Sequence, residues 1–192
     1  MEFTTLHNKQ VMLKPMEKSD IEGILEVAIY PEIWRYLSIT IESLTDTQKY
    51  VANALANKES GVECPFVIMD PKTKTIIGST KFMDIDEKHS RLEIGFTWLT
   101  PAYWQTAVNT NCKYLLLQYC FEVLKLRRVQ IKTDHENKRS QRAIERIGAQ
   151  REGVLRNHMM RKDGTIRHTV MYSVTNEDWP VVKRRLEEMI ER

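Results

Sequence analysis

The residues best suited to do chemistry gather where a predicted strand, residues 127–133, runs into a predicted helix, residues 137–148. A helix start presents free backbone N–H groups, which attract anions. Asn137 and Ser140 lie in this first turn and can make side-chain hydrogen bonds. Three basic side chains add positive charge: Lys138, Arg139 and Arg142. Because Asn is also a preferred N-cap residue and basic helix surfaces are usually solvated, two interpretations stay open, an ordinary capped helix and a phosphate site.

Positive charge is concentrated around this junction. Residues 125–167 contain 13 Lys/Arg and 5 Asp/Glu, whereas the whole chain contains 29 and 26. A net charge of +3 does not by itself indicate a nucleic-acid-binding protein. Charge confined to one segment instead suits a compact polyanionic ligand.

A second strand-to-helix junction precedes the first, between a strand at 91–99 and a helix from about 109 to 125. If the two strands lie side by side, both helix starts open at the same edge of the sheet. Backbone amides of residues 105–110 could then hold a diphosphate, with Asn137 and Ser140 contributing from the neighbouring helix start.

The apolar pattern places both junctions in an α+β fold with a mainly antiparallel sheet. Further strands are predicted at 11–16, 64–70 and 76–85, with a late hairpin around Asp163-Gly164. Further helices are predicted from about 45 to 57 and from Asn176 or Pro180 to the C-terminus.

Single residues mark several local features of these elements. Ser19, with Glu22 three residues later, predicts a capping box for a first helix that ends near Ala28. Gly148 is expected just past the end of helix 137–148. Gly95 inside a strand predicts a bulge or a close backbone approach.

The 192 residues fit one domain, 1–192, and no apolar run reaches the roughly 18 residues of a membrane span. The N-terminus lacks the features of a secretion signal. The three cysteines form no CxxC pair and stand in apolar contexts, which indicates buried, reduced thiols: Cys64, Cys112 and Cys120. We therefore expect a cytoplasmic protein without a membrane partner. The five histidines lack metal-site spacing, so we expect no metal.

Nearly the whole chain resembles the GNAT superfamily of acetyl-CoA-dependent N-acetyltransferases, specifically its RimJ/RimL-like, ribosomal-protein N-acetyltransferase branch. The resemblance rests on "LKPMEKSD", "IIGSTKFMDIDEKHSRLEIGFTWLTPAYWQTAVNT", "FEVLKLRRVQIKTDHENKRSQRAIERIGAQREGVLR" and "KDGTIRHTVMYSV" followed by Trp179. It implies a twisted sheet of about seven strands, split between the fourth (91–99) and the fifth (127–133), and acetyl-CoA as co-substrate.

The resemblance also implies coenzyme contacts. The exposed backbone of Trp98 and Leu99 would pair with the pantetheine arm. The other expected coenzyme-binding residues are Gln105, Thr106, Ala107, Val108, Asn109, Thr110, Asn137, Ser140 and Arg142. Ala107 stands where many relatives have Gly, and an Ala with positive φ would be strained. Asn111 stands where many relatives carry Glu.

Catalytic roles follow from the same resemblance. Ile144 occupies the place of a tyrosine that acts as the acid in many relatives, so that tyrosine is missing here. Ser140 matches a serine proposed for this role in the ribosomal branch and is expected to stabilise the leaving thiolate. Glu93 is the first choice for the base, and His158 is the second. Trp34, Tyr36 and His158 are expected on the acceptor side, where the aromatic rings of Trp34 and Tyr36 suit an apolar or cationic group.

The expected reaction is direct attack on the thioester, in a ternary complex, by a primary amine such as a protein N-terminus or a small molecule. Two alternatives are a non-catalytic CoA-binding or regulatory module and a ribosome- or RNA-associated protein that uses residues 125–167. Nucleic acid is the less favoured partner, and a homodimer is compatible with the family.

Overall fold

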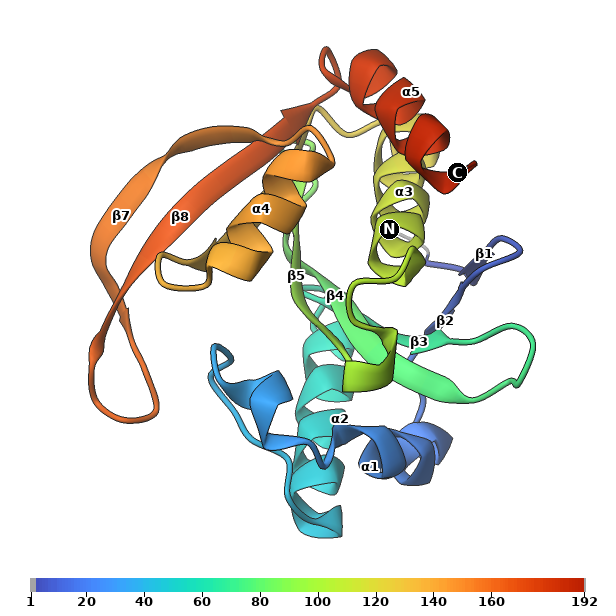
Figure 1. Cartoon of the computed structure of the whole chain (residues 1–192), viewed down its shortest axis with the longest axis vertical. Helices are drawn as coiled ribbons and strands as arrows, with labels where there is room; N and C mark the ends of the chain where they lie inside the picture. The colour runs from blue at the N-terminus through green and yellow to red at the C-terminus, as the bar shows by residue number, and fades with distance from the viewer. Residues whose placement is uncertain (1–2, 192) are drawn as a thin grey trace.

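A computed structural model describes residues 3–191, which build an eight-stranded sheet flanked by helices (Figure 1). The strand order is β1-β2-β3-β4-β5-β6-β8-β7, and every neighbouring pair is antiparallel except β5 and β6. The strands are β1 (Leu6–His7), β2 (Met12–Pro15), β3 (Cys64–Met69), β4 (Ile76–Asp86), β5 (Arg91–Leu99), β6 (Arg128–Asp134), β7 (Gln150–Met160) and β8 (Ile166–Thr175). The α+β class and the mainly antiparallel sheet are confirmed, with eight strands in place of about seven.

The helices divide between the two faces of this sheet. Helices α1 (Ile21–Ala28) and α2 (Leu44–Glu59) share one apolar core with β3, β4 and β5. Helices α3 (Val108–Gln118), α4 (Lys138–Arg146) and α5 (Trp179–Ile190) build the larger core on the other face. Short helical turns are η1 (Lys18–Asp20), η2 (Pro31–Trp34), η3 (Pro101–Tyr103) and η4 (Tyr119–Val123). No helix in residues 3–191 is long and apolar enough to cross a membrane.

The capping box of the first helical segment lies two residues earlier than predicted. The 3₁₀ turn η1 precedes α1, and its N-cap is Glu17, whose backbone N–H donates to Asp20 Oδ2 at 2.8 Å. The prediction of Ser19 as N-cap with Glu22 is therefore wrong, because the chain becomes helical before Ser19. The end of α1 at Ala28 is as predicted.

The helix predicted at 109–125 changes its winding part of the way along. Helix α3 ends at Gln118 and continues as the π-helical turn η4, in which the Leu124 N–H donates to Tyr119 O at 3.0 Å. Two other local predictions are confirmed by positive φ angles: +97° at Gly148, after α4, and +82° at Gly164, in the β7–β8 turn.

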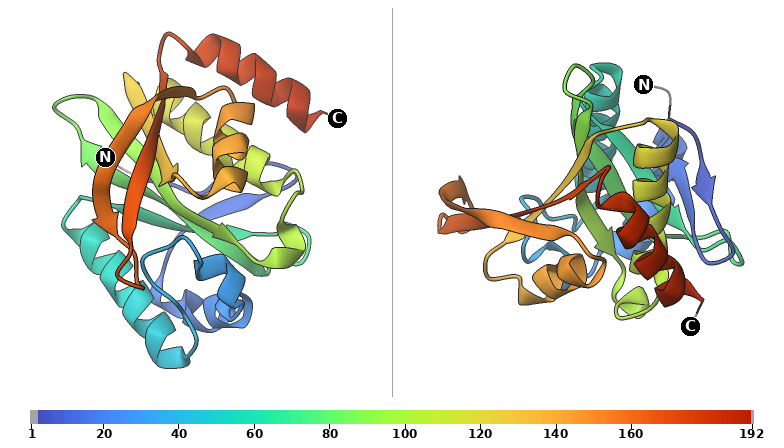
Figure 2. Two further views of the ribbon diagram at one scale, coloured as in Figure 1. Left: turned by 60° about the vertical axis from the view of Figure 1, so that its left-hand side comes forward. Right: turned by 90° about the horizontal axis from the view of Figure 1, so that it is seen from above.

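The β7–β8 hairpin projects from the body of the protein (Figures 1 and 2). Its turn is tethered to the segment after η2, because the Lys162 ammonium donates to Trp34 O at 3.0 Å, Ile39 O at 3.2 Å and Thr40 Oγ1 at 2.6 Å. The hairpin is therefore joined to the end of η2 and to the segment that follows it.

Candidate active site

The sheet opens between its two parallel strands. Strands β5 and β6 pair only over Arg91–Glu93 and Arg128–Gln130, so within the described residues the second half of β5 has no strand on that side. On its other side, Gly95 pairs with Lys81 and Trp98 with Ser79, which leaves Phe96 and Thr97 opposite Thr80 alone. This is a β-bulge, and it frees main-chain groups at the opening.

The bulge lies one residue after the predicted position. Phe96, not Gly95, has the left-handed φ of +50°. Gly95 instead serves the second predicted role, a close approach, since a Cβ there would lie 2.7 Å from Glu93 Oε1 and 2.8 Å from Met83 Sδ. The absence of a side chain at Gly95 thus leaves room for the Glu93 carboxylate.

A cavity of about 750 Å³ passes along this opening. One end, which we term the coenzyme end, is lined by residues at the starts of α3 and α4, including Gln105, Asn109, Asn137 and Ser140. Its other end, which we term the acceptor end, is lined by η2 and the hairpin, including Glu32, Tyr36, Met159 and Arg167. Both predicted junctions therefore open into one space, as the sequence indicated.

The loop before α3 holds no strained alanine. The positive φ falls on Gln105, at +59°, and Ala107 has a helical φ of −68°. Thr106 Oγ1 donates to Tyr103 O at 2.8 Å and accepts from the Val108 N–H at 3.3 Å, which shapes the turn without glycine. The strain expected at Ala107 is thus absent.

Asn111 has a structural role in this loop. It is fully buried, its Nδ2 donates to Ala107 O at 2.9 Å, and its Oδ1 accepts from Asn8 Nδ2 at 2.8 Å. A neutral amide here binds the start of α3 to the turn after β1 without placing a carboxylate near the helix start.

The start of α4 combines a cap with a free hydroxyl. Asn137 Oδ1 accepts from the Ser140 N–H at 3.0 Å, so the capping interpretation of Asn137 is confirmed. Ser140 Oγ lines the cavity and makes no hydrogen bond within residues 3–191. Its hydroxyl is therefore available to a ligand.

Arginines border the coenzyme end along one face of α4. The Arg139 guanidinium lies 3.9 Å from the centroid of the Trp104 ring, and the Trp104 Nε1–H donates to Leu99 O at 2.8 Å. Arg146 Nη2, in the last turn of α4, donates to Thr110 Oγ1 at 3.4 Å and joins the end of α4 to the start of α3. A basic rim with free backbone edges nearby fits a ligand made of an amide-bearing arm and a diphosphate.

Most of the predicted coenzyme residues line the cavity: Trp98, Leu99, Gln105, Thr106, Asn109, Asn137, Ser140 and Arg142. Ala107, Val108 and Thr110 do not line it, and Val108 and Thr110 are buried. The site residues that sequence reasoning missed include Trp104, Lys113, Arg146 and Arg167. The spacing of Arg139, Arg142 and Arg146 along one helix face could have revealed the last member of that row.

Glu93 lies in the opening, as predicted. Its side chain is buried, and its Oε2 accepts from Lys132 Nζ and from Gln130 Nε2, both at 2.9 Å. Oε1 makes no hydrogen bond within the described residues and points toward Gly95, next to the bulge. One oxygen is thus anchored and the other is available.

Of the two aromatic residues predicted on the acceptor side, only one lines the cavity. Tyr36 lines the cavity, whereas Trp34 is 1% exposed, packs against Trp98 and donates from Nε1 to Ala28 O at 2.7 Å. The assignment of Trp34 to the acceptor site is therefore wrong, because its ring faces the core shared with α1 and α2.

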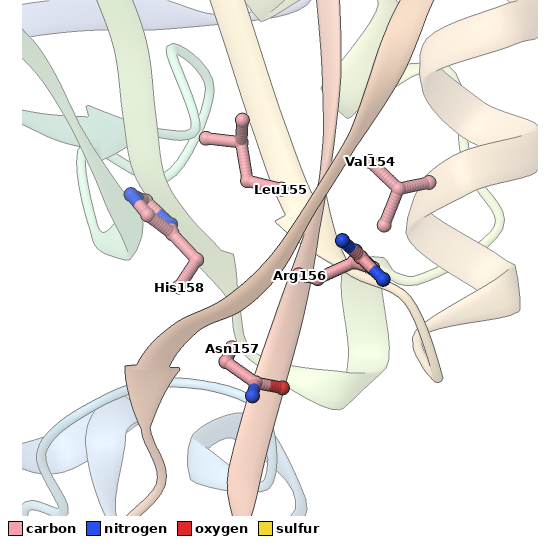
Figure 3. A pocket seen from close by; sticks show the side chains of 5 residues that line it. All are labelled: Val154, Leu155, Arg156, Asn157 and His158. Atoms are coloured by element: carbon pink, nitrogen blue, oxygen red, sulfur yellow. The ribbon is translucent and has the colours of Figure 1, made fainter.

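His158 lies outside the cavity. It borders a shallow groove on β7, where Figure 3 shows Leu155 and His158 on one side of the strand and Val154 and Arg156 on the other. His158 Nδ1 is 3.0 Å from Thr169 Oγ1. The structure thus does not bring His158 into the cavity with Glu93 and Tyr36. Residues 3–191 contain no group of three or more potential metal ligands.

Lys113 is a buried cation beside the bulge. It projects from α3, lines the cavity and donates from Nζ to Thr97 Oγ1 at 2.9 Å, and Thr97 Oγ1 lies 2.7 Å from Thr80 Oγ1. Burial lowers the pKa of Lys113 from 10.5 to about 8. The charged form is thus less favourable in the folded protein than in the unfolded chain.

This burial predicts a pH-dependent stability. Between pH 8 and 10.5 the unfolded chain retains a proton on Lys113 that the folded protein loses, so the free energy of unfolding should rise with pH there. Lys113→Met should remove that rise and, after loss of the bond to Thr97, stabilise the protein by about 1–2 kcal/mol at pH 7. Urea unfolding from pH 7 to 10 measures both effects. If the free energy of unfolding of Lys113→Met rose with pH as steeply as that of the wild type, the rise could not be due to Lys113.

Known proteins share this architecture. Residues 10–150 match the family "Acetyltransferase (GNAT) domain". The chain is 28% identical over 175 residues to the uncharacterized N-acetyltransferase YoaA of Bacillus subtilis (strain 168), with 90% of this chain and 97% of that protein covered. A GCN5-related N-acetyltransferase from Brucella melitensis has a similar crystal structure, with a TM-score of 0.92 at 25% identity and coverage of 99% and 86%.

Mycobacterium smegmatis RimJ in complex with CoA-disulfide has the same fold, with a TM-score of 0.81 at 19% identity and coverage of 96% of this chain and 92% of that one. The family match over residues 10–150 agrees with the split sheet and the basic cavity end. The protein therefore belongs to the GNAT family as an acetyl-CoA-dependent N-acetyltransferase.

Proposed function

We propose that the protein transfers an acetyl group from acetyl-CoA directly to a primary amine, with both substrates bound in one ternary complex. The observation that carries this proposal is the cavity that runs through the β5–β6 opening from the starts of α3 and α4, where α4 supplies the arginines, to the acceptor end. Acetyl-CoA would enter from the basic end, and the amine from the side of η2 and the hairpin. The two substrates would meet at the bulge.

The cysteines support direct transfer. All three are buried, none lines the cavity, and burial raises the pKa of Cys64 and of Cys112 to about 12. A thiol with such a pKa is a poor nucleophile at neutral pH. An acetylated cysteine is therefore not expected on the route to product.

Acetyl-CoA supplies an activated thioester, and this chain supplies the groups around it. Backbone N–H groups at the Phe96–Thr97 bulge would polarise the thioester carbonyl. Glu93 Oε1 takes the amine proton, directly or through water, as the C–N bond forms. The Ser140 hydroxyl donates a hydrogen bond to the thiolate released when the C–S bond breaks.

Release of CoA from acetyl-CoA, measured across a panel of primary amines, tests the proposed function. Initial-rate plots should intersect, as a ternary complex requires, and parallel lines would indicate an acetylated enzyme. Acetyl-CoA binding measured by calorimetry without an amine should be detectable. Binding with no turnover on any amine, or no binding at all, would overturn the proposal.

The role of Ser140 gives a specific prediction. Ser140→Ala should lower kcat about tenfold with little change in the KM for acetyl-CoA, because the lost hydrogen bond matters only as negative charge grows on sulfur. Ser140→Thr retains the hydroxyl and should recover most of the rate. Equal kcat in the alanine variant and the wild type would exclude this role.

A further inference from the structure

Arg167 places an unpaired positive charge at the acceptor end of the cavity. It lies near the start of β8 and lines the cavity, and its side chain is partly buried. Its Nε is buried without a hydrogen-bond partner, and no other hydrogen bond or ion pair of its guanidinium occurs within residues 3–191. The contrast with neighbouring cations is clear, since Lys132 and Arg161 both pair with carboxylates.

The nearby carboxylates are already occupied. Asp134 accepts from Arg161 Nε at 2.8 Å and from Arg161 Nη2 at 3.0 Å, and Arg161 holds the pKa of Asp134 below its usual value despite burial. Glu93 Oε2 accepts from Lys132 and Gln130. Both carboxylates influence Arg167 electrostatically, but neither makes an ion pair with it.

An unpaired guanidinium in this position is costly. Burial lowers the pKa of Arg167, which reports the penalty on its charged form. A partly desolvated cation without a partner destabilises a protein unless an anion compensates it. Because Arg167 faces the cavity, the missing anion can come from a bound ligand.

The position of Arg167 indicates which ligand that is. The basic rim of the coenzyme end lies on α4, whereas Arg167 belongs to the acceptor end with Tyr36 and Met159. The hairpin that carries it is fixed by the Lys162 bonds to the segment after η2, so the guanidinium is pre-positioned. Its planar fork matches a carboxylate with two parallel hydrogen bonds.

We propose that Arg167 binds a carboxylate of the acceptor, so that the substrates are amines that carry a carboxylate close to the reacting nitrogen. This inference rests on the proposed function and adds a substrate class to it. Two sources share the chemistry: a free amino acid, through its own α-carboxylate, and a peptide N-terminus followed by an acidic side chain. A free polyamine or a cationic antibiotic would be disfavoured.

The experiment compares matched acceptors that differ only in this group. One arm uses a free amino acid and its amide, and the other uses peptides with Asp or Asn at the second position. All are assayed for CoA release at a fixed concentration of unprotonated amine with wild type, Arg167→Met and Arg167→Glu. Arg156→Met is the control, because Arg156 is an exposed arginine on β7 outside the cavity.

Wild type should prefer the carboxylate member of at least one pair by about tenfold to a hundredfold in kcat/KM, mostly through KM. Arg167→Met should abolish that preference, Arg167→Glu should reverse it, and Arg156→Met should change nothing. A preference seen only in the free amino acid pair would identify an α-carboxylate as the bound group, and a preference seen only in the peptide pair would identify an acidic side chain. Arg167→Met should also retain or raise the thermal midpoint, since a costly charge is removed, whereas a structural arginine would lower it.

Calorimetry of the same acceptors with the CoA-bound enzyme tests the Arg167 site separately from the proposed function. If no amine is acetylated but carboxylate-dependent binding is lost in Arg167→Met, the Arg167 site stands and the proposed function fails. If amines are acetylated with no preference in either pair, or with a preference that Arg167→Met retains, the Arg167 inference is overturned and the proposed function stands.

Discussion

A Glu93→Gln enzyme should turn over about a hundredfold more slowly than wild type at neutral pH, while it binds acetyl-CoA equally well. The amide keeps the size of the carboxylate but cannot accept the proton that the attacking amine must lose. Glu93 Oε2 is anchored by Lys132 and Gln130, and Oε1 points toward the bulge at Phe96. The variant should therefore lose rate in the step that forms the C–N bond.

A matched control separates this chemistry from loss of an ion pair. Glu136 also lies near the junction of β6 and α4 and pairs with Arg161 at 3.0 Å, but it does not line the cavity. Glu136→Gln should retain the wild-type kcat. If Glu93→Gln retained it as well, the proton would leave by another route, and Glu93 would serve only to hold Lys132 across the β5–β6 opening.

Features set by neighbouring residues in the sequence were predictable. Asn137 and Gly148 delimit α4 as expected, and Asp163-Gly164 turns the late hairpin, because caps and tight turns depend on a few adjacent residues. The meeting of two helix starts also followed, once the strands that precede them were assumed to be neighbours.

Features set by pairing between distant segments were not predictable in detail. The bulge falls at Phe96 because of the register with β4, and no local signal distinguishes it from Gly95. The direction of Trp34 could not be predicted, because an aromatic residue on a short turn can face either the core or the cavity. In the structure its ring packs in the core against Trp98. Lys113 lies in a buried stripe, so only the fold reveals that it reaches Thr97.

The basic segment 125–167 illustrates both cases. Its charge excess was visible in the sequence, but the partners of each charge were not. Lys132 and Arg161 pair with buried carboxylates, whereas Arg139, Arg142, Arg146 and Arg167 line the cavity. The four arginines at one cavity favour a compact ligand over an extended polymer such as RNA.

Gly78→Ala should destabilise the protein strongly, by about 3 kcal/mol or more. Gly78 lies in β4 opposite Leu99, and an added Cβ would lie 2.2 Å from Trp98 O and 3.0 Å from Leu99 Cα. Both are main-chain atoms, so no side-chain rotation relieves the overlap. The strands must separate at the residues that precede the coenzyme loop, so acetyl-CoA affinity should fall together with stability.

Gly23→Ala is the natural comparison for that variant. Gly23 lies in α1, and the nearest atom to its added Cβ is Ile76 Cδ1, the end of a flexible side chain, at 3.0 Å. Alanine also favours the helix by about 1 kcal/mol, so this variant should unfold at or above the wild-type urea midpoint. Urea unfolding and acetyl-CoA calorimetry on both variants provide the test. A Gly78→Ala protein with wild-type stability and affinity would contradict the prediction, because it would show that β4 and β5 accommodate the added methyl group without disturbing the coenzyme site.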